Sequence, residues 1–370
     1  MFNIKNLQGK IRIGQIQTRH GVIDTPAFLP DATYGSVKML SFDDVKDAGI
    51  NQILCTTLHL HIKPGDKYIK RMGGMHKFFG WDRPILTDCG GWQVFSLIHQ
   101  SGKGEVTEEG AKFIMPNDGR EEILTPESSI NIQINLKSDI VLALDDPVLG
   151  DSSIKANSKS VDLTIKWAKR AKEEFLKRYH LTDKKFDNPY KYKRPLLFSV
   201  IQGGNYKKLR KKCAEALIEI GFDGYGYGGI LLKNDKKKTR EILKYFAELV
   251  PKDKIRYGMG VGKPDDIEYC IKCGYDLFDC VVPTRNGRHG QCFTSFGSIN
   301  LKSSRYRYDN RAIDRKCDCE SCRVVDGRPK ASRAYLHHLL KTKEVTGMRL
   351  SSMHNLKFYA DLLKHYRETI

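Results

Sequence analysis

Residues 275–293, YDLFDCVVPTRNGRHGQCF, carry the features from which we predict both the fold and the chemistry of this chain. The stretch begins as an apolar run of the kind found in strands buried on both faces, and one carboxylate, Asp279, lies inside it. Pro283 is expected to end the strand, and Arg285 and Arg288 follow among glycines that allow close backbone approach. An acid followed by cations predicts chemistry beside a phosphate-bearing substrate. A buried aspartate paired with an arginine for structure is the alternative.

Outward from this stretch, apolar runs alternate with helical patterns along most of the chain. The eight predicted strands are residues 27–30, 52–57, 84–87, 139–144, 195–201, 222–226, 256–259 and 277–282. The predicted helices include residues 42–44, 64–72, 125–136, 158–176, 206–220, 239–249 and 264–270, several of them opened by a capping Ser or Thr or by Pro. Eight strands alternating with helices predict a parallel (β/α)8 barrel. An open doubly wound sheet is the alternative fold, but no G-x-G-x-x-G follows the first strand.

Four segments are predicted outside this repeat. Residues 10–30 form a hairpin that turns at His20-Gly21, and residues 92–124 are an insertion with a small hairpin at 111–114 and 121–124. The lysine-rich residues 178–194 are expected to form a solvated surface loop. A region from residue 294 onward carries a cysteine cluster and is followed by helical patterns at 334–340 and 356–363.

Composition narrows the class of protein. The 370 residues include 63 Lys and Arg against 44 Asp and Glu, which gives a formal charge of +19 and favours a polyanionic partner such as nucleic acid. The first residues lack the apolar core of a signal peptide, and no run approaches the length of a membrane span. We therefore expect a cytoplasmic protein without a membrane partner. Its ten cysteines are expected to be thiols or metal ligands.

Polar groups stand at the C-terminal ends of the predicted strands, where parallel barrels carry their active sites. They are Asp88, Asp145, Gln202, Met259 and Asp279, with glycine pairs at 90–91, 203–204 and 228–229. Aspartate can accept from the N1–H and amine of a guanine-like base, the glutamine can donate and accept, and methionine offers an apolar face. These groups together predict a pocket for a nitrogenous base. For any one acid, a helix cap or a barrel salt bridge is the competing explanation.

Two of these acids suggest a reaction type. Asp88 and Asp279 lie on different predicted strands and could divide nucleophilic and proton-transfer roles at a glycosidic carbon, as two carboxyl groups do in retaining glycosidases. Cys89 and Cys280 are in the same region but lack an obvious base, so a cysteine nucleophile is the weaker choice.

The cysteines at 317, 319 and 322 form the most specific local motif. Three thiolates within six residues are typical of a knuckle around tetrahedral zinc, and His337, His338 and His354 are candidates for the fourth ligand. A site closed by four protein ligands is structural, so we expect one structural Zn²⁺ per chain. The pair Cys270 and Cys273 has ligand spacing but no second pair, and we interpret it as a helix end.

Several long motifs resemble the tRNA-guanine transglycosylases, in particular bacterial-type enzymes without an added C-terminal RNA-binding domain. The motifs are TYGSVKML (33–40), GGMHKFFGWDRPILTDCGGWQVFSL (73–97), SVIQGG (199–204), GFDGYGYGG (221–229), YGMGVGKPDDI (257–267), FDCVVPTRNGRHGQ (278–291), CDCESC (317–322), SRAYLHHL (332–339) and MHNLKFY (353–359). The resemblance covers most of the chain. It implies a single catalytic domain over residues 1–370, a (β/α)8 barrel with a zinc-binding subdomain at 294–356 and usually a homodimer.

The resemblance also implies an activity and roles for residues. The family's pentosyltransferases exchange guanine at the wobble position of tRNA with a G-U-N anticodon for a free 7-deazaguanine, in queuosine modification. Asp279 matches the nucleophile that attacks ribose C1′, and Asp88 matches the acid that handles the proton of the departing and incoming base. The positions that match base recognition or the pocket wall are Asp145, Gln202, Gly229, Met259 and Tyr257, with Trp92 at an aromatic lid. Those that match anticodon contacts are Thr284, Arg285 and Arg288, and the implied zinc ligands are Cys317, Cys319, Cys322 and His354.

Departures from the family pattern surround the expected site of the 7-substituent. Cys89 replaces a common serine, Pro147 follows Asp145-Asp146 where bacterial enzymes have a cysteine, and residues 230–234 replace a segment of small residues. The bulky Leu232 favours 7-aminomethyl-7-deazaguanine, whereas the lost cysteine favours queuine, and we place the aminomethyl base ahead.

Three other functions are compatible with parts of the sequence. A deazaguanine transferase acting on DNA would equally suit the positive charge. A noncatalytic RNA-binding partner subunit would be expected to lose the nucleophile, whereas Asp279 and Asp88 are both present. A barrel hydrolase acting on small sugars explains the two carboxylates but not the base-reading groups or the charge.

Overall fold

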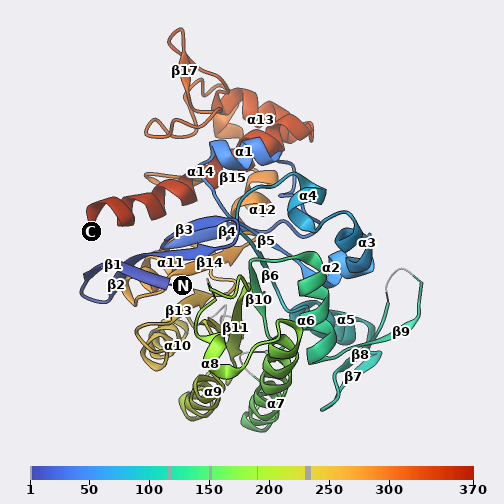
Figure 1. The fold of residues 1–370 in the computed structure, drawn as a ribbon. Helices are drawn as coiled ribbons and strands as arrows, with labels where there is room; N and C mark the ends of the chain where they lie inside the picture. Colours follow the sequence, from blue (N-terminus) through green and yellow to red (C-terminus); the bar gives the residue numbers. More distant parts are fainter. Residues whose placement is uncertain (1, 116–117, 150–151, 190, 230–234) are drawn as a thin grey trace.

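The computed structural model describes residues 2–115, 118–149, 152–189, 191–229 and 235–370, and an eight-stranded parallel sheet lies at its centre (Figure 1). Its strands are β4 (Ala27–Pro30), β5 (Ile53–Cys55), β6 (Ile85–Thr87), β10 (Ile140–Leu142), β11 (Leu196–Ile201), β12 (Gly224–Tyr227), β13 (Ile255–Gly258) and β14 (Leu277–Cys280). Each lies within or overlaps one of the eight predicted runs, so the strand prediction is confirmed.

The sheet closes into a barrel. Its strand order is β4-β14-β13-β12-β11-β10-β6-β5, and the two end strands meet through a parallel bridge between Asp31 and Leu54. The backbone N–H of Ala32 donates to the carbonyl of Leu54 at 2.7 Å across the same junction. Closure brings β4 beside β14, with Leu29 opposite Asp279, so residues far apart in sequence share one rim. We use "rim" for the C-terminal ends of these eight strands.

Helices surround the barrel as the alternation predicts. They are α1 (Phe42–Asp47), α2 (Thr57–Ile62), α3 (Asp66–Arg71), α4 (Met75–Phe79), α6 (Pro126–Leu136), α7 (Ile154–Arg178), α9 (Lys207–Ile220), α10 (Lys236–Leu249) and α11 (Pro264–Lys272). The expected caps are present: the side chain of Ser41 accepts from the N–H of Asp44, and that of Thr125 accepts from the N–H of Ser128.

The segment after β14 differs from the sequence prediction. The strand ends at Cys280, and α12 (Val282–Arg288) begins two residues later, with Pro283 in its first turn. Proline is tolerated there because the first N–H groups of a helix have no intrahelical partner. Arg285 and Arg288 therefore lie on a helix that starts at the rim.

The two predicted additions before the middle of the chain are larger than expected. The N-terminal hairpin, β2 (Ile11–Thr18) and β3 (Gly21–Thr25), gains a third strand, β1 (Phe2–Gln8). The insertion contains the predicted hairpin of β8 (Ala111–Ile114) and β9 (Glu121–Leu124), preceded by α5 (Gly91–Ser101) and by β7 (Gly104–Val106), which pairs with β8.

The prediction of a solvated loop at residues 178–194 is partly wrong. A short helix, α8 (Asp183–Phe186), buries Phe186, and Arg194 is also buried. The Arg194 guanidinium donates to both carboxylate oxygens of Asp223, at 2.6 and 2.9 Å, and stacks over the Phe186 ring at 3.7 Å. Phe186 and Arg194 therefore attach this lysine-rich segment to the barrel.

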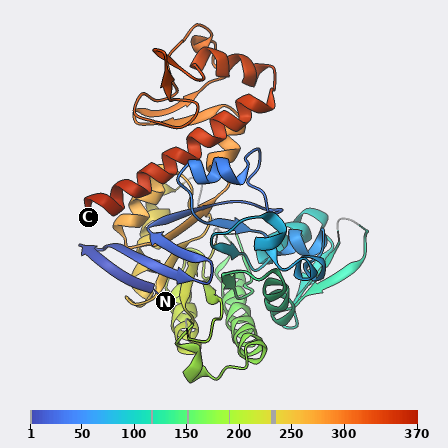
Figure 2. The same cartoon turned by 45° about the horizontal axis from the view of Figure 1, so that its top comes forward.

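The C-terminal region stands apart from the barrel on one long helix (Figure 2). Its elements are β15 (Gln291–Thr294), β16 (Gly297–Asn300), the 3-10 turn η1 (Ser304–Tyr306), β17 (Val324–Val325), β18 (Arg328–Pro329), α13 (Arg333–Lys341) and α14 (Val345–Thr369). It has a separate apolar core that includes Cys292, Leu301, Ile313 and Leu336. Among the described residues, no helix is long and apolar enough to cross a membrane.

Candidate active site at the barrel rim

Asp279 lies near the end of β14 with one carboxylate oxygen held firmly. The hydroxyl of Tyr257 on the neighbouring strand donates to Oδ1 at 2.6 Å, and the N–H of Gly260 donates to the same oxygen at 3.1 Å. Burial raises the pKa of Asp279 to about 6, although both hydrogen bonds oppose the rise. Among the described residues both donors meet at Oδ1, and Oδ2 receives neither of these bonds.

Asp88 follows β6 and is held by the starts of α2 and α5. The N–H of Thr57 donates to its Oδ1 at 2.8 Å, and the side-chain amide of Gln93 on α5 donates to its Oδ2 at 2.7 Å. Burial raises the pKa of Asp88 to about 7, against both bonds. A carboxyl group with this pKa exchanges its proton near neutral pH, which suits proton transfer.

The two acids lie around one tyrosine. Burial raises the pKa of the Tyr257 phenol well above its usual value, and the negative charges of Asp279 and then Asp88 raise it further. Tyr257 is fully buried, and its hydroxyl is directed at Asp279. Two acids with different pKa values allow one site to hold an ionised nucleophile beside a protonated acid.

A third acid at the rim was not anticipated. Asp31 directly follows β4, and its charge raises the pKa values of both Asp279 and Asp88. Burial raises the pKa of Asp31, while a hydrogen bond from Thr33 and the charges of His59 and Arg288 oppose the rise. No sequence pattern pointed to Asp31, because only the closed barrel places the end of β4 between those of β14 and β5.

The expected base-recognition residues Asp145 and Gln202 are in direct contact. The side-chain amide of Gln202 donates to Oδ2 of Asp145 at 2.6 Å, and the thiol of Cys89 donates to its Oδ1 at 3.1 Å. Because the amide nitrogen of Gln202 is committed to the carboxylate, its carbonyl oxygen points the other way. That oxygen is buried and has no partner among the described residues, so it is a ready acceptor for a ligand N–H.

Glycines at the rim are required by these side chains. A Cβ on Gly228 would lie 2.6 Å from the amide nitrogen of Gln202, and one on Gly226 would lie 2.6 Å from the sulfur of Met259. Gly229 has a φ of +112°, which other residues rarely adopt. Of the expected binding residues, Gly229 follows the glycine that packs against Gln202, and Met259 packs against Gly226. Residues 230–234, including Leu232, are outside the described residues.

Arg210 on α9 supports the ends of β11 and β12, and no sequence pattern indicated this role. Its fully buried guanidinium donates to the carbonyls of Ile201, Gly204 and Gly228 at 2.8–2.9 Å. It also lies over the ring of Tyr227 at 4.3 Å. One side chain thus joins the ends of β11 and β12 and fixes the glycine pairs on each. Nothing in the helical pattern of α9 distinguishes this arginine from its exposed basic neighbours.

The remaining expected contacts surround the rim. Trp92, at the second position of α5, is exposed and stacks on Phe95 with 5.4 Å between ring centroids. On α12, Arg285 is exposed, and Arg288 is partly buried with one guanidinium nitrogen that has no hydrogen-bond partner in the described chain. Thr284 is buried, and its hydroxyl donates to the carbonyl of Val281 at 3.4 Å, so its side chain faces the protein.

The structure also describes Asp146 and Pro147, where the sequence departs from the family pattern. Pro147 is buried, and burial raises the pKa of the preceding Asp146 to about 7 with a further contribution from the charge of Asp145. The backbone of Asp146 is fixed by Ser160 and Thr164 of α7. The acids at 145 and 146 therefore have separate surroundings, one inside the pocket and one against α7.

The cysteine cluster forms a four-ligand group. The ligand atoms of Cys317, Cys319, Cys322 and His354 all lie within 4.8 Å of one another. Nδ1 of His354 faces the thiols of Cys322 and Cys319 at 3.4 and 3.6 Å, and its other nitrogen, Nε2, is 2.7 Å from the carbonyl of Phe293. A histidine that binds metal with one nitrogen and donates to a carbonyl with the other is the usual arrangement, so these residues fit zinc.

The other candidates for metal binding are excluded by position. His337 contacts the carbonyl of Leu301 at 2.8 Å, and His338 is exposed. Cys270 and Cys273 are free thiols near the end of α11 and belong to none of the metal-binding groups found among the described residues. The geometry therefore groups His354, and neither of the other two histidines, with the three cysteines among the described residues.

The metal group and the rim are connected through α14. Next to His354, the side chain of Asn355 donates to the carbonyls of Pro283 and Gln291, both at 2.9 Å, and accepts from the N–H of Phe293. A Cβ on Gly287 would lie 2.6 Å from Cα of Ser352, so α12 and α14 need a glycine to pack this closely. The helix that carries Arg285 and Arg288 therefore depends on the helix that carries the metal-facing histidine.

Comparison with known proteins agrees with this geometry. The chain matches the family model described as Queuine tRNA-ribosyltransferase over residues 8–370. It is 41% identical over 369 residues to the Queuine tRNA-ribosyltransferase of Blochmanniella pennsylvanica, an alignment that covers 100% of this chain and 94% of the relative. The relative of the same name from Francisella tularensis subsp. novicida is 42% identical over 370 residues, with coverage of 100% and 94%. The chain therefore belongs to the queuine tRNA-ribosyltransferase family, whose members are pentosyltransferases.

Proposed function

We propose that this protein exchanges guanine at the wobble position of tRNA for a 7-deazaguanine through a covalent intermediate on Asp279. The observation that carries the proposal is the pair of rim acids, Asp279 and Asp88, with pKa values raised to about 6 and about 7 by burial around the same tyrosine. Raised pKa values let both acids change protonation state near neutral pH, and we assign the ionised form to Asp279 as nucleophile and the protonated form to Asp88 as general acid.

The reaction proceeds in two displacements. Oδ2 of Asp279 forms a bond to ribose C1′ while the bond from C1′ to the base nitrogen breaks, and Asp88 gives its proton to the departing guanine. The incoming base then loses a proton to Asp88, its nitrogen forms the new bond to C1′, and Asp279 leaves as a carboxylate. Tyr257 and the N–H of Gly260 support the carboxylate of Asp279 in its ionised state.

Base recognition is assigned to the contact between Asp145 and Gln202. The free carbonyl oxygen of Gln202 accepts an N–H of the base, and Asp145 accepts from the N1–H and exocyclic amine once the base replaces its present partners. Met259 and the backbone of Gly229 border the base, and Trp92 covers it. For the 7-substituent we place the aminomethyl group ahead of the larger queuine, on the bulk of Leu232 in the sequence.

Positive charge near the rim supports an RNA partner. Arg285 and Arg288 lie on α12 directly beyond Asp279. A groove of about 730 Å³ between β7 and the first half of α7 is lined by three lysines and also by Glu108 and Asp162, so its charge is mixed. We assign the two arginines of α12 to the sugar-phosphate backbone of the anticodon arm.

We further propose that the zinc bound by Cys317, Cys319, Cys322 and His354 is structural. When bound, this ion crosslinks the loop at 317–322 to α14. Four protein ligands leave it no open position, so it takes no part in the chemistry. We also propose that residues 1–370 act as one catalytic domain with a subdomain at 294–356, and that two copies form a homodimer.

The decisive experiment is incorporation of radiolabelled guanine into unmodified tRNA with a G-U-N anticodon. The chase uses 7-aminomethyl-7-deazaguanine and queuine in separate reactions. We expect label to enter, one deazaguanine to displace it irreversibly, and a protein–RNA adduct stable to denaturing electrophoresis to accumulate with wild-type protein only. Controls are tRNA with another anticodon and a DNA hairpin of the same sequence. Label in DNA alone would favour the DNA transferase, and no label with metal-loaded protein would favour a noncatalytic subunit.

The variant Asp279→Asn tests the nucleophile. It should form no adduct and incorporate no guanine, yet fold normally. Because the pKa of Asp279 is raised in the folded protein, its ionisation lowers the free energy of unfolding as pH rises from the usual carboxyl pKa to about 6. Asp279→Asn removes this charge, so it should raise the free energy of unfolding above pH 6 by up to about 3 kcal/mol. Screening of the charge by solvent would make the gain smaller. Full activity in this variant would refute the assignment.

A further inference from the structure

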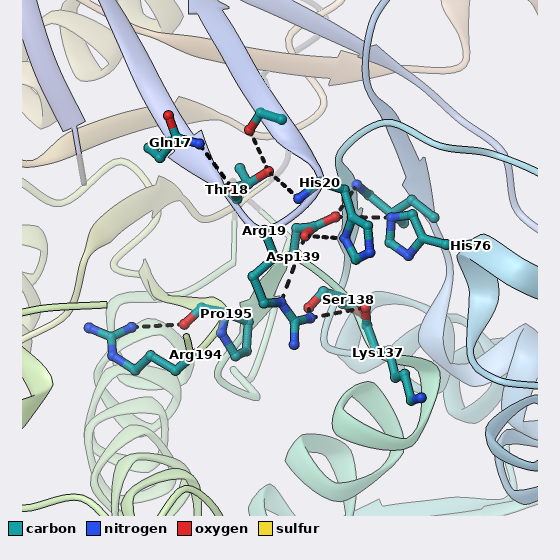
Figure 3. A network of polar contacts seen from close by, with 12 residues as sticks. Gln17, Thr18, Arg19, His20, His76, Lys137, Ser138, Asp139, Arg194 and Pro195 are labelled. Atoms are coloured by element: carbon teal, nitrogen blue, oxygen red, sulfur yellow. Dashed lines mark hydrogen bonds and ion pairs between the residues drawn. The ribbon is translucent and has the colours of Figure 1, made fainter. Parts of the chain in front are cut away.

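A second group of metal-ligating side chains lies at the end of the barrel opposite the rim. His20 comes from the turn between β2 and β3, His76 from α4, and Asp139 directly precedes β10 (Figure 3). Because Asp139 stands at the N-terminal end of a strand whose other end leads to Asp145, the barrel separates this group from the active site. We call it the His20 cluster.

The two imidazoles present nitrogens to one buried carboxylate. Nδ1 of His20 lies 2.7 Å from Oδ1 of Asp139, and Nε2 of His76 lies 3.1 Å from Oδ2. The Asp139 side chain has no exposed surface, whereas His20 is about one-third exposed, so the group can be reached from solvent on one side. Figure 3 shows both rings turned toward the carboxylate from the same side.

The rings are arranged as paired ligands. They stack with 3.5 Å between centroids and 17° between planes, and one nitrogen of each ring faces the carboxylate. All three ligand atoms lie within 4.8 Å of one another. A tetrahedral ion with bonds of about 2.0–2.2 Å places its ligand atoms roughly 3.3–3.6 Å apart, so binding requires the partly exposed His20 ring to rotate out of the stack until both nitrogen lone pairs point at one ion. Two imidazoles and a carboxylate are also the ligand set of an open zinc site.

The competing explanation is that the cluster only ties the hairpin to the barrel by hydrogen bonds. The N–H of Ile85 already occupies Oδ2 of Asp139 at 3.0 Å, and Nε of Arg19 lies 3.8 Å from Oδ1. The Arg19 guanidinium also donates to the carbonyls of Lys137 and Ser138, as Figure 3 shows. The positive charge of Arg19 repels a divalent cation. Removing that charge should therefore strengthen metal binding if the cluster is a metal site, which tells the two explanations apart.

We propose that His20, His76 and Asp139 form a second metal site, which takes a divalent transition ion such as Zn²⁺ with water completing its coordination. Binding replaces the imidazole protons that now face the carboxylate, and these protons pass to solvent. The carbonyl of Arg83, 3.1 Å from Nε2 of His76, is close enough to approach the ion. The ion crosslinks the β2–β3 turn, α4 and the start of β10.

The test is the number of zinc ions bound per chain after equilibration with buffered free Zn²⁺. Wild-type protein should bind two, one at the four-ligand cysteine site and one at the His20 cluster. His20→Gln should bind one, while His338→Gln, which removes an exposed histidine elsewhere, should still bind two. Because the His20 cluster lies opposite the rim, guanine exchange by His20→Gln should equal that of wild type. One zinc in wild-type protein, or two in His20→Gln, would overturn the proposal.

Two further variants separate a metal site from a purely structural cluster. Cys319→Ala should lose the zinc of the cysteine site and keep the ion at the His20 cluster. Arg19→Gln removes the nearby cation, so it should bind the second zinc at least several-fold more tightly than wild type. If the cluster were only a set of hydrogen bonds, Arg19→Gln would bind only the zinc of the cysteine site, and this result would also contradict the proposal.

Discussion

The hydroxyl of Tyr257 is predicted to set the acid limb of the pH dependence of base exchange. Burial raises the pKa of Asp279 to about 6, and the hydrogen bond from Tyr257 holds it below the value that burial alone would give. A hydrogen bond to a charged group contributes about 1.5–3 kcal/mol, and about 1.4 kcal/mol corresponds to one pKa unit. Tyr257→Phe should therefore raise the pKa of Asp279 by about 1–2 units.

The sign follows from the role of the group. In the proposed mechanism Asp279 attacks as a carboxylate, so activity should be lost below its pKa and appear as pH rises through it. Asp88 gives its proton to guanine, so activity falls as pH rises through about 7. In Tyr257→Phe, the acid limb should move from about 6 to about 7–8, and kcat/KM at pH 7 should fall roughly two- to tenfold. The optimum should shift toward higher pH.

The assay is kcat/KM for labelled guanine incorporation into tRNA, measured from mildly acidic to mildly alkaline pH. Tyr225→Phe is the matched control, because Tyr225 lies on the adjacent strand β12 and its buried hydroxyl has no partner among the described residues. This control should keep the wild-type limb. An unchanged acid limb in Tyr257→Phe would refute the view that this hydrogen bond governs the nucleophile.

Three further outcomes follow from the site. Asp31→Asn removes a charge that raises the pKa values of Asp279 and Asp88, so both limbs of the profile should move to lower pH; movement of one limb alone would show that Asp31 acts on a single acid. Arg210→Met leaves three buried carbonyls without their donor, at about 1–3 kcal/mol each, so denaturant unfolding should reveal a loss of at least about 3 kcal/mol and KM for guanine should rise. An unchanged KM would mean that Arg210 does not position the base pocket. Cys319→Ala should lose one zinc, lower the melting temperature and, through α14 and α12, raise KM for tRNA, whereas Cys270→Ala should keep the wild-type zinc content; equal zinc in both variants would contradict the four-ligand site.

Local sequence patterns were sufficient to predict the barrel and its repeat. Buried parallel strands are continuous apolar runs, and helix starts carry capping residues, so both signals can be read without knowing which elements touch. Pro283 is a position at which the sequence pattern alone leaves the following element undecided. Proline stops a strand and also begins a helix, and only the structure shows that α12 starts there.

Most of the predicted site residues also came together, because strand ends in a closed parallel barrel share one rim. Asp88, Asp145, Gln202 and Asp279 each follow or end a recognisable strand, so their meeting could be predicted from position alone. The proposed metal ligand His354 lies on α14, far from the cysteines in sequence. Its selection rested on the resemblance, and the fold places its Nδ1 against the thiols.

Sequence by itself determined the kind of fold, the acids at its rim and the cysteine ligands, because each of these follows from a pattern within one segment. Tertiary structure alone decided what Asp31, Tyr257 and Arg210 do, because their effects depend on neighbours from other strands. A charge perturbs a pKa, and a buried guanidinium binds carbonyls, according to distance in space. The same reason explains why His20, His76 and Asp139 carried no signal until the hairpin, α4 and β10 were placed side by side.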